Sequence, residues 1–284
     1  MRSVRIAGLP ADSHVHSEWS WDAPYTSMER ACERAAELGL PSIAFTEHAD
    51  FTSRHLGHGV EPSDWQRDIV TDGILTPPAF DVDGYLVCLS RCRDRFPGLR
   101  ILSGVELGEP HWHDPKVAEL IKRARFDRVL VSLHTLPAVD TGHTTVDAAY
   151  ATALPGQIVR AYLRELRALV TGFDDFDVLA HIDYAARYWP RAAGEYPLED
   201  FRDEYQAVLS PLAAKGKALE VNTGGPLAFD IVRWWHELEG QAITFGSDAH
   251  RPEQVARGFA QAAAFAEAAG FAPGRDPQGP WMRC

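Results

Sequence analysis

The sequence predicts a single α/β domain, spanning residues 1–284, in which seven parallel strands alternate with helices and close into a barrel. Two observations lead to this fold class. Short apolar segments alternate with amphipathic segments about seven times, as in parallel strands joined by helical crossovers. Each apolar segment also ends in side chains that can bind metal, and in a barrel the carboxyl ends of all strands meet on one face. The alternation alone would also fit a doubly wound open sheet, but the polar strand ends favour the barrel.

The strands and helices follow from the apolar pattern and its stop signals. The opening strand is expected at residues 11–17. The helix over 27–40 has Ser27 as its N-cap candidate and Gly39 as its stop signal. Later strands are expected over 41–48, 99–108, 127–134, 176–183, 217–225 and 241–250, with helices over 82–96, 114–124, 157–170, 198–216, 229–240 and 252–270.

Two long segments, residues 49–80 and 135–156, interrupt this alternation and show no clear period. Long irregular segments inside a compact domain are usually functional lids or disordered stretches. We expect both to lie as loops over the site, with mobile surface insertions as the alternative. The tail over 272–284 is expected to be irregular.

The chain is acidic, with 28 Lys and Arg against 40 Asp and Glu and a formal net charge of −12. This sign disfavours broad binding to nucleic acids or anionic membranes, because both require a positive field. A small anionic substrate held in a local metal or arginine pocket is compatible with it. We therefore expect a small-molecule partner, with neither nucleic acid nor membrane.

The sequence features that bear on cellular location agree with one another. No stretch of about 18 apolar residues is present to span a bilayer. The opening MRSVRIAGLPADSH lacks the apolar run of a signal peptide. The four cysteines form no CxxC pair and indicate no disulfide scaffold in a chain of this size. The expected location is the cytoplasm.

Side chains that can bind metal recur where each predicted strand ends. A lone histidine there is more often a structural residue, but a barrel would bring the whole set together. The donors are imidazole nitrogens and carboxylate oxygens, which suit Zn, Mn or Fe in a catalytic site. They exceed the needs of one ion, so we expect two or three divalent ions bridged by a carboxylate such as Glu106, an arrangement typical of hydrolytic and phosphoryl-transfer enzymes. The strand-end residues are His14, His16, Glu47, His48, Glu106, His134, His181, Asp183, Asn222, Asp248 and His250.

Most of these strand-end residues belong to six short motifs that occur in a characteristic order. They are HxH at 14–16, TEH at 46–48, GVE at 104–106, SLH at 132–134, AHID at 180–183 and GSDAH at 246–250. Together they resemble the PHP (polymerase and histidinol phosphatase) family, from Asp12 to about Gly258. The resemblance implies a distorted (β/α)7 barrel with a trinuclear metal site at the carboxyl ends of the strands, in agreement with the seven units above.

The resemblance also implies three groups of metal ligands. The first is His14, His16, Asp248 and the bridging Glu106, the second is Glu106, His134 and His181, and the third is His48 and His250. Some members complete the third group with a histidine six residues after the HxH motif, where this chain has Asp22. A carboxylate can bind metal there, while the alternative is that Asp22 caps a turn. Glu47 is expected to orient a ligand.

Three segments, residues 81–110, 126–134 and 178–188, are similar to monofunctional histidinol-phosphatases. The resemblance implies hydrolysis of the phosphomonoester L-histidinol phosphate to L-histidinol and phosphate, in histidine biosynthesis. Arg187 is then a candidate for phosphate binding and for catalysis. Asp248, His250 and a metal-bound water are the candidates for protonating the leaving alkoxide.

Further residues are candidates for contact with the substrate. Arg54 lies in the first long segment, and Trp19 follows the HxH motif. For Arg54 and Arg187 the alternative is a solvated surface arginine. The remaining candidates for the substrate pocket are His55, His58, His111, Trp112 and His113.

Other functions fit parts of the sequence. A PHP phosphoesterase could act on a nucleotide or another small phosphate, and an exonuclease-like domain would need a basic groove that the acidic chain lacks. A non-catalytic metal-binding module would be expected to have lost ligands. An amidohydrolase usually has a bridging lysine after the fourth strand, where this chain has His134.

Overall fold

The structure is a computed structural model that describes residues 8–225, 229–276 and 278–284. Residues 1–7, part of the opening segment in which no signal peptide is expected, lie outside the described residues. Among the described residues, no helix combines the length and apolar character needed to cross a lipid bilayer.

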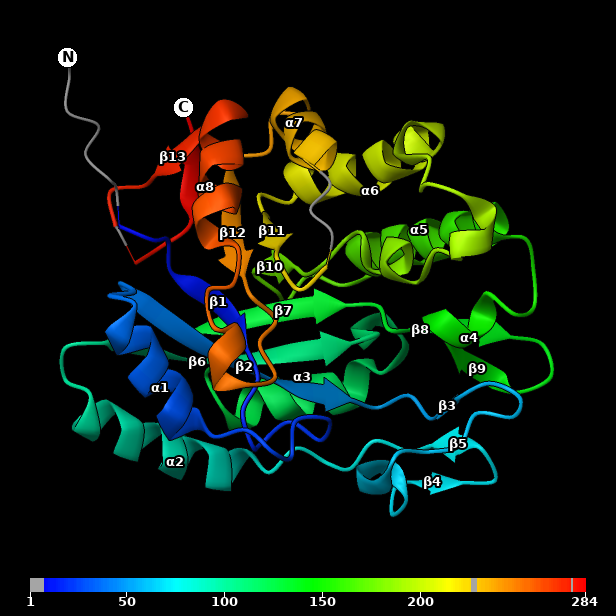
Figure 1. The fold of residues 1–284 in the computed structure, drawn as a ribbon, viewed down its shortest axis with the longest axis horizontal. Helices are drawn as coiled ribbons and strands as arrows, with labels where there is room; N and C mark the ends of the chain where they lie inside the picture. Colours follow the sequence, from blue (N-terminus) through cyan, green and yellow to red (C-terminus); the bar gives the residue numbers. More distant parts are fainter. Residues whose placement is uncertain (1–7, 226–228, 277) are drawn as a thin grey trace.

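Seven parallel strands form a closed barrel, which confirms the predicted fold class (Figure 1). The first strand pairs with the second and also with the seventh, which closes the ring. The nine residues of the second strand are all buried, as expected for a parallel strand covered on both faces. The ring order is β1 (Asp12–Val15), β2 (Ser42–Asp50), β6 (Arg100–Gly108), β7 (Arg128–Ser132), β10 (Val178–Leu179), β11 (Ala218–Asn222) and β12 (Ala242–Gly246).

The helices lie outside the strands and bury one apolar face each. In the first helix the Ser27 side chain accepts a hydrogen bond from the backbone of Arg30, so Ser27 is the N-cap as expected. The same helix buries Met28, Ala31 and Ala35, whose spacing places them on one face. The larger helices are α1 (Met28–Glu37), α2 (Val82–Arg95), α3 (Asp114–Arg123), α5 (Pro155–Gly172), α6 (Arg202–Ala214), α7 (Phe229–Glu237) and α8 (Phe259–Ala268).

Several predicted elements are shorter than expected, and three of them have a visible cause in the backbone. The strand predicted over 176–183 pairs only through β10, because the chain turns away from the sheet at His181. The helix predicted over 198–216 begins with the 3-10 turn η5 (Leu198–Phe201). The helix predicted over 252–270 divides into η6 (Pro252–Gln254) and α8, because Ala256 and Gly258 between them have left-handed backbone angles.

The prediction of an irregular tail is wrong. β13 (Phe271–Pro273) and β14 (Trp281–Arg283) form an antiparallel pair, and β14 extends the sheet from the first residues of β12. Trp281 is buried there, with its ring edge-on to Phe245 at 4.9 Å between centroids. Strands of three residues are too short to show a period in the sequence.

The two interrupting segments are ordered and join each other beyond the carboxyl ends of the barrel strands (Figure 1). The first contributes three short strands and the 3-10 turn η1 (Asp64–Gln66), the second two strands and the helix α4 (Val146–Ala149). Backbone pairing of His55 with Thr144 links them. Their sheet has the order β4 (Val70–Thr71), β5 (Ile74–Leu75), β3 (Arg54–His55), β9 (Gly142–Thr145) and β8 (Thr135–Ala138).

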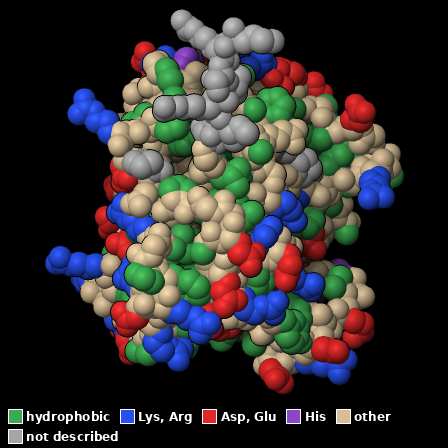
Figure 2. Space-filling view, turned by 60° about the vertical axis from the view of Figure 1, so that its left-hand side comes forward, with side chains coloured by type: hydrophobic (Ala, Val, Ile, Leu, Met, Phe, Trp, Pro, Cys, Tyr) green, Lys and Arg blue, Asp and Glu red, His purple; other side chains and the backbone are tan. Residues whose placement is uncertain are grey.

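The surface mixes charges of both signs. On the face shown in Figure 2, acidic and basic side chains lie next to one another between small apolar areas. Charged side chains of the described residues also form ion pairs, for example Arg95 with Glu29 and Glu33. Together with the net charge of −12, this distribution favours small ligands over a polyanion.

The hairpin of β13 and β14 should contribute measurably to stability. We expect Trp281→Ala to lower the free energy of unfolding by about 3 kcal/mol, because it leaves a cavity against Phe245. Met282→Ala is the matched control, since the neighbouring Met282 is 42% exposed. Urea denaturation followed by circular dichroism measures both variants. A loss below about 1 kcal/mol for Trp281→Ala would show that the tail does not stabilise the barrel.

Candidate metal centre and active site

The buried carboxylate of Glu106, at the end of β6, lies at the centre of the strand ends. Its Oε2 atom is 3.2 Å from His14 Nε2, 3.4 Å from His16 Nε2 and 3.2 Å from His48 Nδ1. These histidines come from β1 and its end and from β2. One carboxylate oxygen is thus shared among three imidazoles from two neighbouring strands.

The other oxygen of Glu106 faces the opposite side of the barrel. Oε1 lies 2.8 Å from His181 Nε2 and 3.4 Å from His134 Nε2. Both histidines follow their strands by two residues, after β10 and β7. Glu106 therefore has the position expected of a bridging ligand, with five imidazoles around its two oxygens.

Asp248 completes the side of the cluster next to β1. Its Oδ1 atom is 3.4 Å from His16 Nε2 and 3.8 Å from His14 Nε2. The backbone of Asp248 is left-handed, with φ of 53°, and its N–H donates to the carbonyl of His14. This conformation is unfavourable for a non-glycine residue and recurs at functional sites, where surrounding contacts enforce it.

Asp22 faces two histidines and does not simply cap a turn. Its Oδ2 atom lies 3.2 Å from His48 Nε2 and 3.0 Å from His250 Nε2. The other oxygen, Oδ1, is buried without a hydrogen-bond partner among the described residues. The ring of His16 stacks on His48 at 4.3 Å, so this group adjoins the one around Asp248.

These side chains fit divalent metal ions. The Nδ1 atoms of His14 and His16 face Glu220 and Ser20, so their Nε2 atoms point inward, where a neutral ring can bind metal. Those two Nε2 atoms are only 3.0 Å apart, an arrangement that a cation between them would stabilise. Four groups place their nitrogen and oxygen donors within 4.8 Å of one another: His16, Asp22, His48 and His250; His14, Glu106 and His181; His14, His16 and Asp248; and His48, Asp50 and His134.

The carboxylates of the cluster are held in their ionised form. Burial by itself raises the pKa of Glu106, but the attraction of His14 and His48 outweighs it and holds that pKa well below its usual range. The same balance, with His14 and Arg187 as partners, keeps the pKa of Asp248 low. Ionised carboxylates in a buried site attract cations, which again favours metal.

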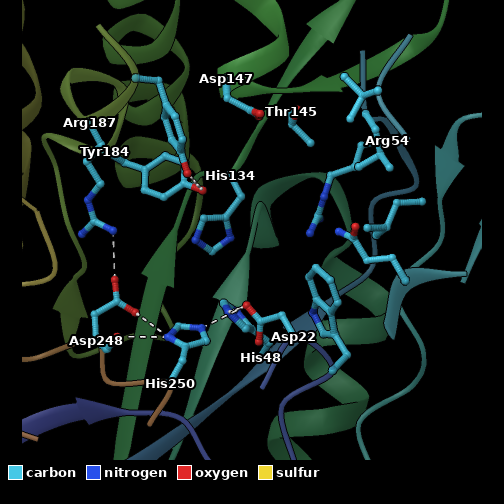
Figure 3. A pocket seen from close by; sticks show the side chains of 16 residues that line it. Asp22, His48, Arg54, His134, Thr145, Asp147, Tyr184, Arg187, Asp248 and His250 are labelled. Atoms are coloured by element: carbon cyan, nitrogen blue, oxygen red, sulfur yellow. Dashed lines mark hydrogen bonds and ion pairs between the residues drawn. The ribbon is translucent and has the colours of Figure 1, made fainter. Parts of the chain in front are cut away.

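A cavity of about 380 Å³ opens above this cluster (Figure 3). Asp22, His48, His134, Asp248 and His250 form part of its lining, so the proposed ligands are accessible from it. The rest of the wall comes from Trp21, from the two interrupting segments and from η3 (Tyr184–Tyr188). A volume of this size suits a small molecule.

Comparison with models of known families shows to which family the chain belongs. The model of the PHP domain matches residues 12–224, three quarters of the chain. The chain belongs to the PHP domain family.

Relatives of this PHP domain carry one recurring name. A histidinol-phosphatase from Lactococcus lactis is 26% identical over 247 residues, covering 84% of this chain and 83% of that protein. A protein named "Probable histidinol-phosphatase" from Clostridium acetobutylicum is 25% identical, with 92% and 94% covered. The crystal structure of the Lactococcus lactis histidinol phosphate phosphatase, complexed with Zn, L-histidinol and phosphate, has a TM-score of 0.76, 24% identity and coverage of 93% and 94%.

Arg187 lies in the wall of the PHP domain's cavity. Its guanidinium donates to Asp248 Oδ2 at 3.0 Å and to Asn222 Oδ1 at 2.8 Å, and it stacks over the ring of Tyr184. Although burial lowers the pKa of Arg187, the charges of Asp248 and Asp183 raise it further above its usual value. The side chain is 16% exposed, so it is neither a solvated surface arginine nor closed off from the cavity.

Arg54 lines the same cavity from β3. It donates to Asp50 Oδ2 at 3.1 Å and lies over the ring of Trp21 at 5.2 Å. Its Nη1 atom is buried without a hydrogen-bond partner among the described residues. The alternative of a solvated loop residue is therefore excluded for Arg54.

Other sequence candidates lie away from this cavity. Trp19 packs against Gly84 of α2 and is absent from the lining, where Trp21 is present instead. His111 contacts Glu165, and His113 contacts Thr52. The remaining candidates that do not line this cavity are His55, His58 and Trp112.

A carboxylate that sequence reasoning missed supports the cluster from behind. Glu220 in β11 is buried, accepts from His14 Nδ1 at 2.7 Å and accepts from the backbone N–H of His181 at 2.8 Å. Asn222 donates to its second oxygen at 2.9 Å. The signal in the sequence was a charged residue inside the apolar strand segment ALEVN.

Glu47 has the orienting position that was expected of it. Its carboxylate accepts from the hydroxyls of Ser17 and Ser20, and Ser20 Oγ accepts from His16 Nδ1 at 2.9 Å. Burial raises the pKa of Glu47 to about 7, although the hydrogen bonds from both serines lower it. This chain of contacts fixes the ring of His16.

Removing the charge of Glu220 should weaken metal binding through His14. We expect Glu220→Gln to lower the affinity for Zn²⁺ about 10- to 100-fold, because the amide no longer fixes the His14 ring as a carboxylate does. Glu267→Gln, at an exposed position of α8, is the matched control. Competition with a chromogenic chelator measures the affinity. Equal affinity of both variants would assign Glu220 a purely structural role.

Proposed function

We propose that this PHP domain is a metal-dependent phosphomonoester hydrolase that converts L-histidinol phosphate to L-histidinol and phosphate, a step of histidine biosynthesis. The observation that carries the proposal is the arrangement of imidazoles and carboxylates around Glu106 on the floor of a cavity with two arginines in its wall. The names of the relatives support the substrate, as does the ligand content of the Lactococcus lactis structure.

The metal ligands are proposed in three groups, for two or three ions of Zn, Mn or Fe. His14, His16, Asp248 and Glu106 form the first, Glu106, His134 and His181 the second, and Asp22, His48 and His250 the third. When bound, such ions supply the Lewis acidity that lowers the pKa of water and offsets phosphoryl charge. The donor set is nitrogen and oxygen only, which suits these metals.

The side chains in the wall position the phosphoryl group. Arg187 points one of its nitrogens at Asp248, beside the cluster, and can pair with phosphoryl oxygens at the same place. Its second contact, to Asn222, and the ring of Tyr184 hold the guanidinium in orientation. Arg54, held by Asp50, adds a second positive charge at the cavity wall.

The leaving alkoxide needs a proton. Asp248 and His250 both line the cavity next to the cluster, but Asp248 is held ionised and has no proton to give, so we propose His250 for this transfer. The side chain of His250 is 32% exposed, while that of Asp248 is 10% exposed and already paired with Arg187. His250 is therefore the more accessible of the two to a leaving group.

Phosphate release from L-histidinol phosphate tests the proposal directly. We expect the purified protein with added Zn or Mn to hydrolyse it in preference to a nucleoside monophosphate, p-nitrophenyl phosphate and single-stranded DNA. Chelator and Glu106→Gln should each abolish the activity, because both remove the metal cluster. Activity on the other phosphates only would retain the hydrolase and reject the substrate. No metal-dependent release from any of them would reject the hydrolase.

Loss of Arg187 should impair the chemical step. We expect Arg187→Met to lower kcat/KM about 100-fold or more, because a positive charge beside the phosphoryl group is lost. Arg191→Met, an exposed arginine four residues further along, should be within about twofold of the wild type. Steady-state kinetics measure both. If the two variants behaved alike, Arg187 would have no role in catalysis.

A further inference from the structure

The cavity wall contains one carboxylate that neither the metal cluster nor the arginines engage. Asp22 and Asp248 also line the cavity, but both lie within 3.4 Å of histidines of the cluster. Both arginines of the wall are likewise paired with carboxylates. Asp147, from α4, has no salt-bridge partner among the described residues. Its charge is thus available to a ligand.

The position of Asp147 is fixed relative to the metal cluster. The backbone N–H of its neighbour Val146 donates to the carbonyl of His134, a proposed ligand, at 3.2 Å. At the other end of α4, the hydroxyl of Tyr150 donates to the carbonyl of Ala185 at 2.8 Å. Val146, the first residue of α4, is fully buried. The short helix is therefore anchored on both sides of the cavity.

Asp147 lies in the wall of the cavity beyond His134. Figure 3 shows its carboxylate across His134 from Asp22 and His48. Tyr188 lines the same region, and its hydroxyl donates to that of Tyr184 at 3.1 Å. Burial raises the pKa of Tyr188, and the nearby charge of Asp147 adds to the effect. A phosphate held at the cluster would thus direct its organic part toward this carboxylate and the two tyrosines.

We propose that Asp147 is a specificity-determining residue that binds the ammonium group of the substrate's leaving group. This inference rests on the proposed function, in which that leaving group is an amino alcohol. Its ammonium lies two carbons from the ester oxygen and is therefore closer to the phosphoryl group than the imidazole ring is. An ammonium has three donors and no acceptor, and it matches a carboxylate that lacks a partner. The metal cluster does not distinguish leaving groups, whereas Asp147 does.

The test is a selectivity ratio, which a merely structural effect would not move. For each protein, kcat/KM is measured with L-histidinol phosphate, with its analogue lacking the amino group and with p-nitrophenyl phosphate. We expect Asp147→Asn to lower the ratio of the first to the second about fivefold, the upper range for a partly exposed charge pair. The ratio of the second to the third should not change. Asp140→Asn, an exposed aspartate in the turn between β8 and β9, is the matched control.

Each outcome bears on one of the two proposals. An unchanged selectivity ratio in Asp147→Asn, with a wild type that hydrolyses L-histidinol phosphate, overturns the role of Asp147 and leaves the proposed function standing. An equal loss with the analogue that lacks the amino group also overturns it. A wild type that hydrolyses p-nitrophenyl phosphate but not L-histidinol phosphate overturns the proposed function, and the inference with it.

Discussion

The contact between the carboxylate of Glu106 and five imidazoles is the interaction on which the rest of the site depends. Its two oxygens lie 2.8 to 3.4 Å from nitrogens supplied by four different strands or their ends. An ionised carboxylate at full burial loses several kcal/mol of hydration, which only nearby positive charge can offset. Although burial lowers the pKa of His14 and of His48, the surrounding carboxylates raise it further, so their protonated rings supply that charge, which bound metal ions would replace. The closed barrel is what brings these strand ends together.

A second layer keeps the imidazoles aimed at that centre. Glu220 holds His14 from β11, and Glu47 holds His16 through Ser20. Each of these contacts points the Nε2 atom of its histidine inward, where it can bind metal. The same layer ties the barrel closed, because Asp248 N–H donates to the carbonyl of His14 at the junction of the first and last strands. The contact that closes the ring of strands thus also positions two members of the cluster.

The features that could be predicted from the sequence are those that depend on the hydrophobic period and on the residues at the strand ends. The seven strands, and the convergence of residues as distant as His14 and Asp248, followed from alternation and from the parallel arrangement. The sequence did not predict Glu220, because a charge inside an apolar strand gives no sign of which way it points. The sequence also could not show that Trp21 lines the cavity and Trp19 does not. The two tryptophans flank the same serine, and the orientation of each depends on the fold.

The strands of the two interrupting segments could not be predicted from the sequence, although these segments form part of the cavity wall. Their strands have two to four residues, too few for a period, and they pair across about 90 residues of sequence through His55 and Thr144. Their position is fixed by tertiary contacts with the barrel, above all the hydrogen bond from the backbone N–H of Val146 to the carbonyl of His134. That bond joins the wall of the cavity to a proposed ligand on its floor. The proposed metal ligands at the strand ends and the cavity wall formed by the insertions are therefore held in a fixed relation to each other.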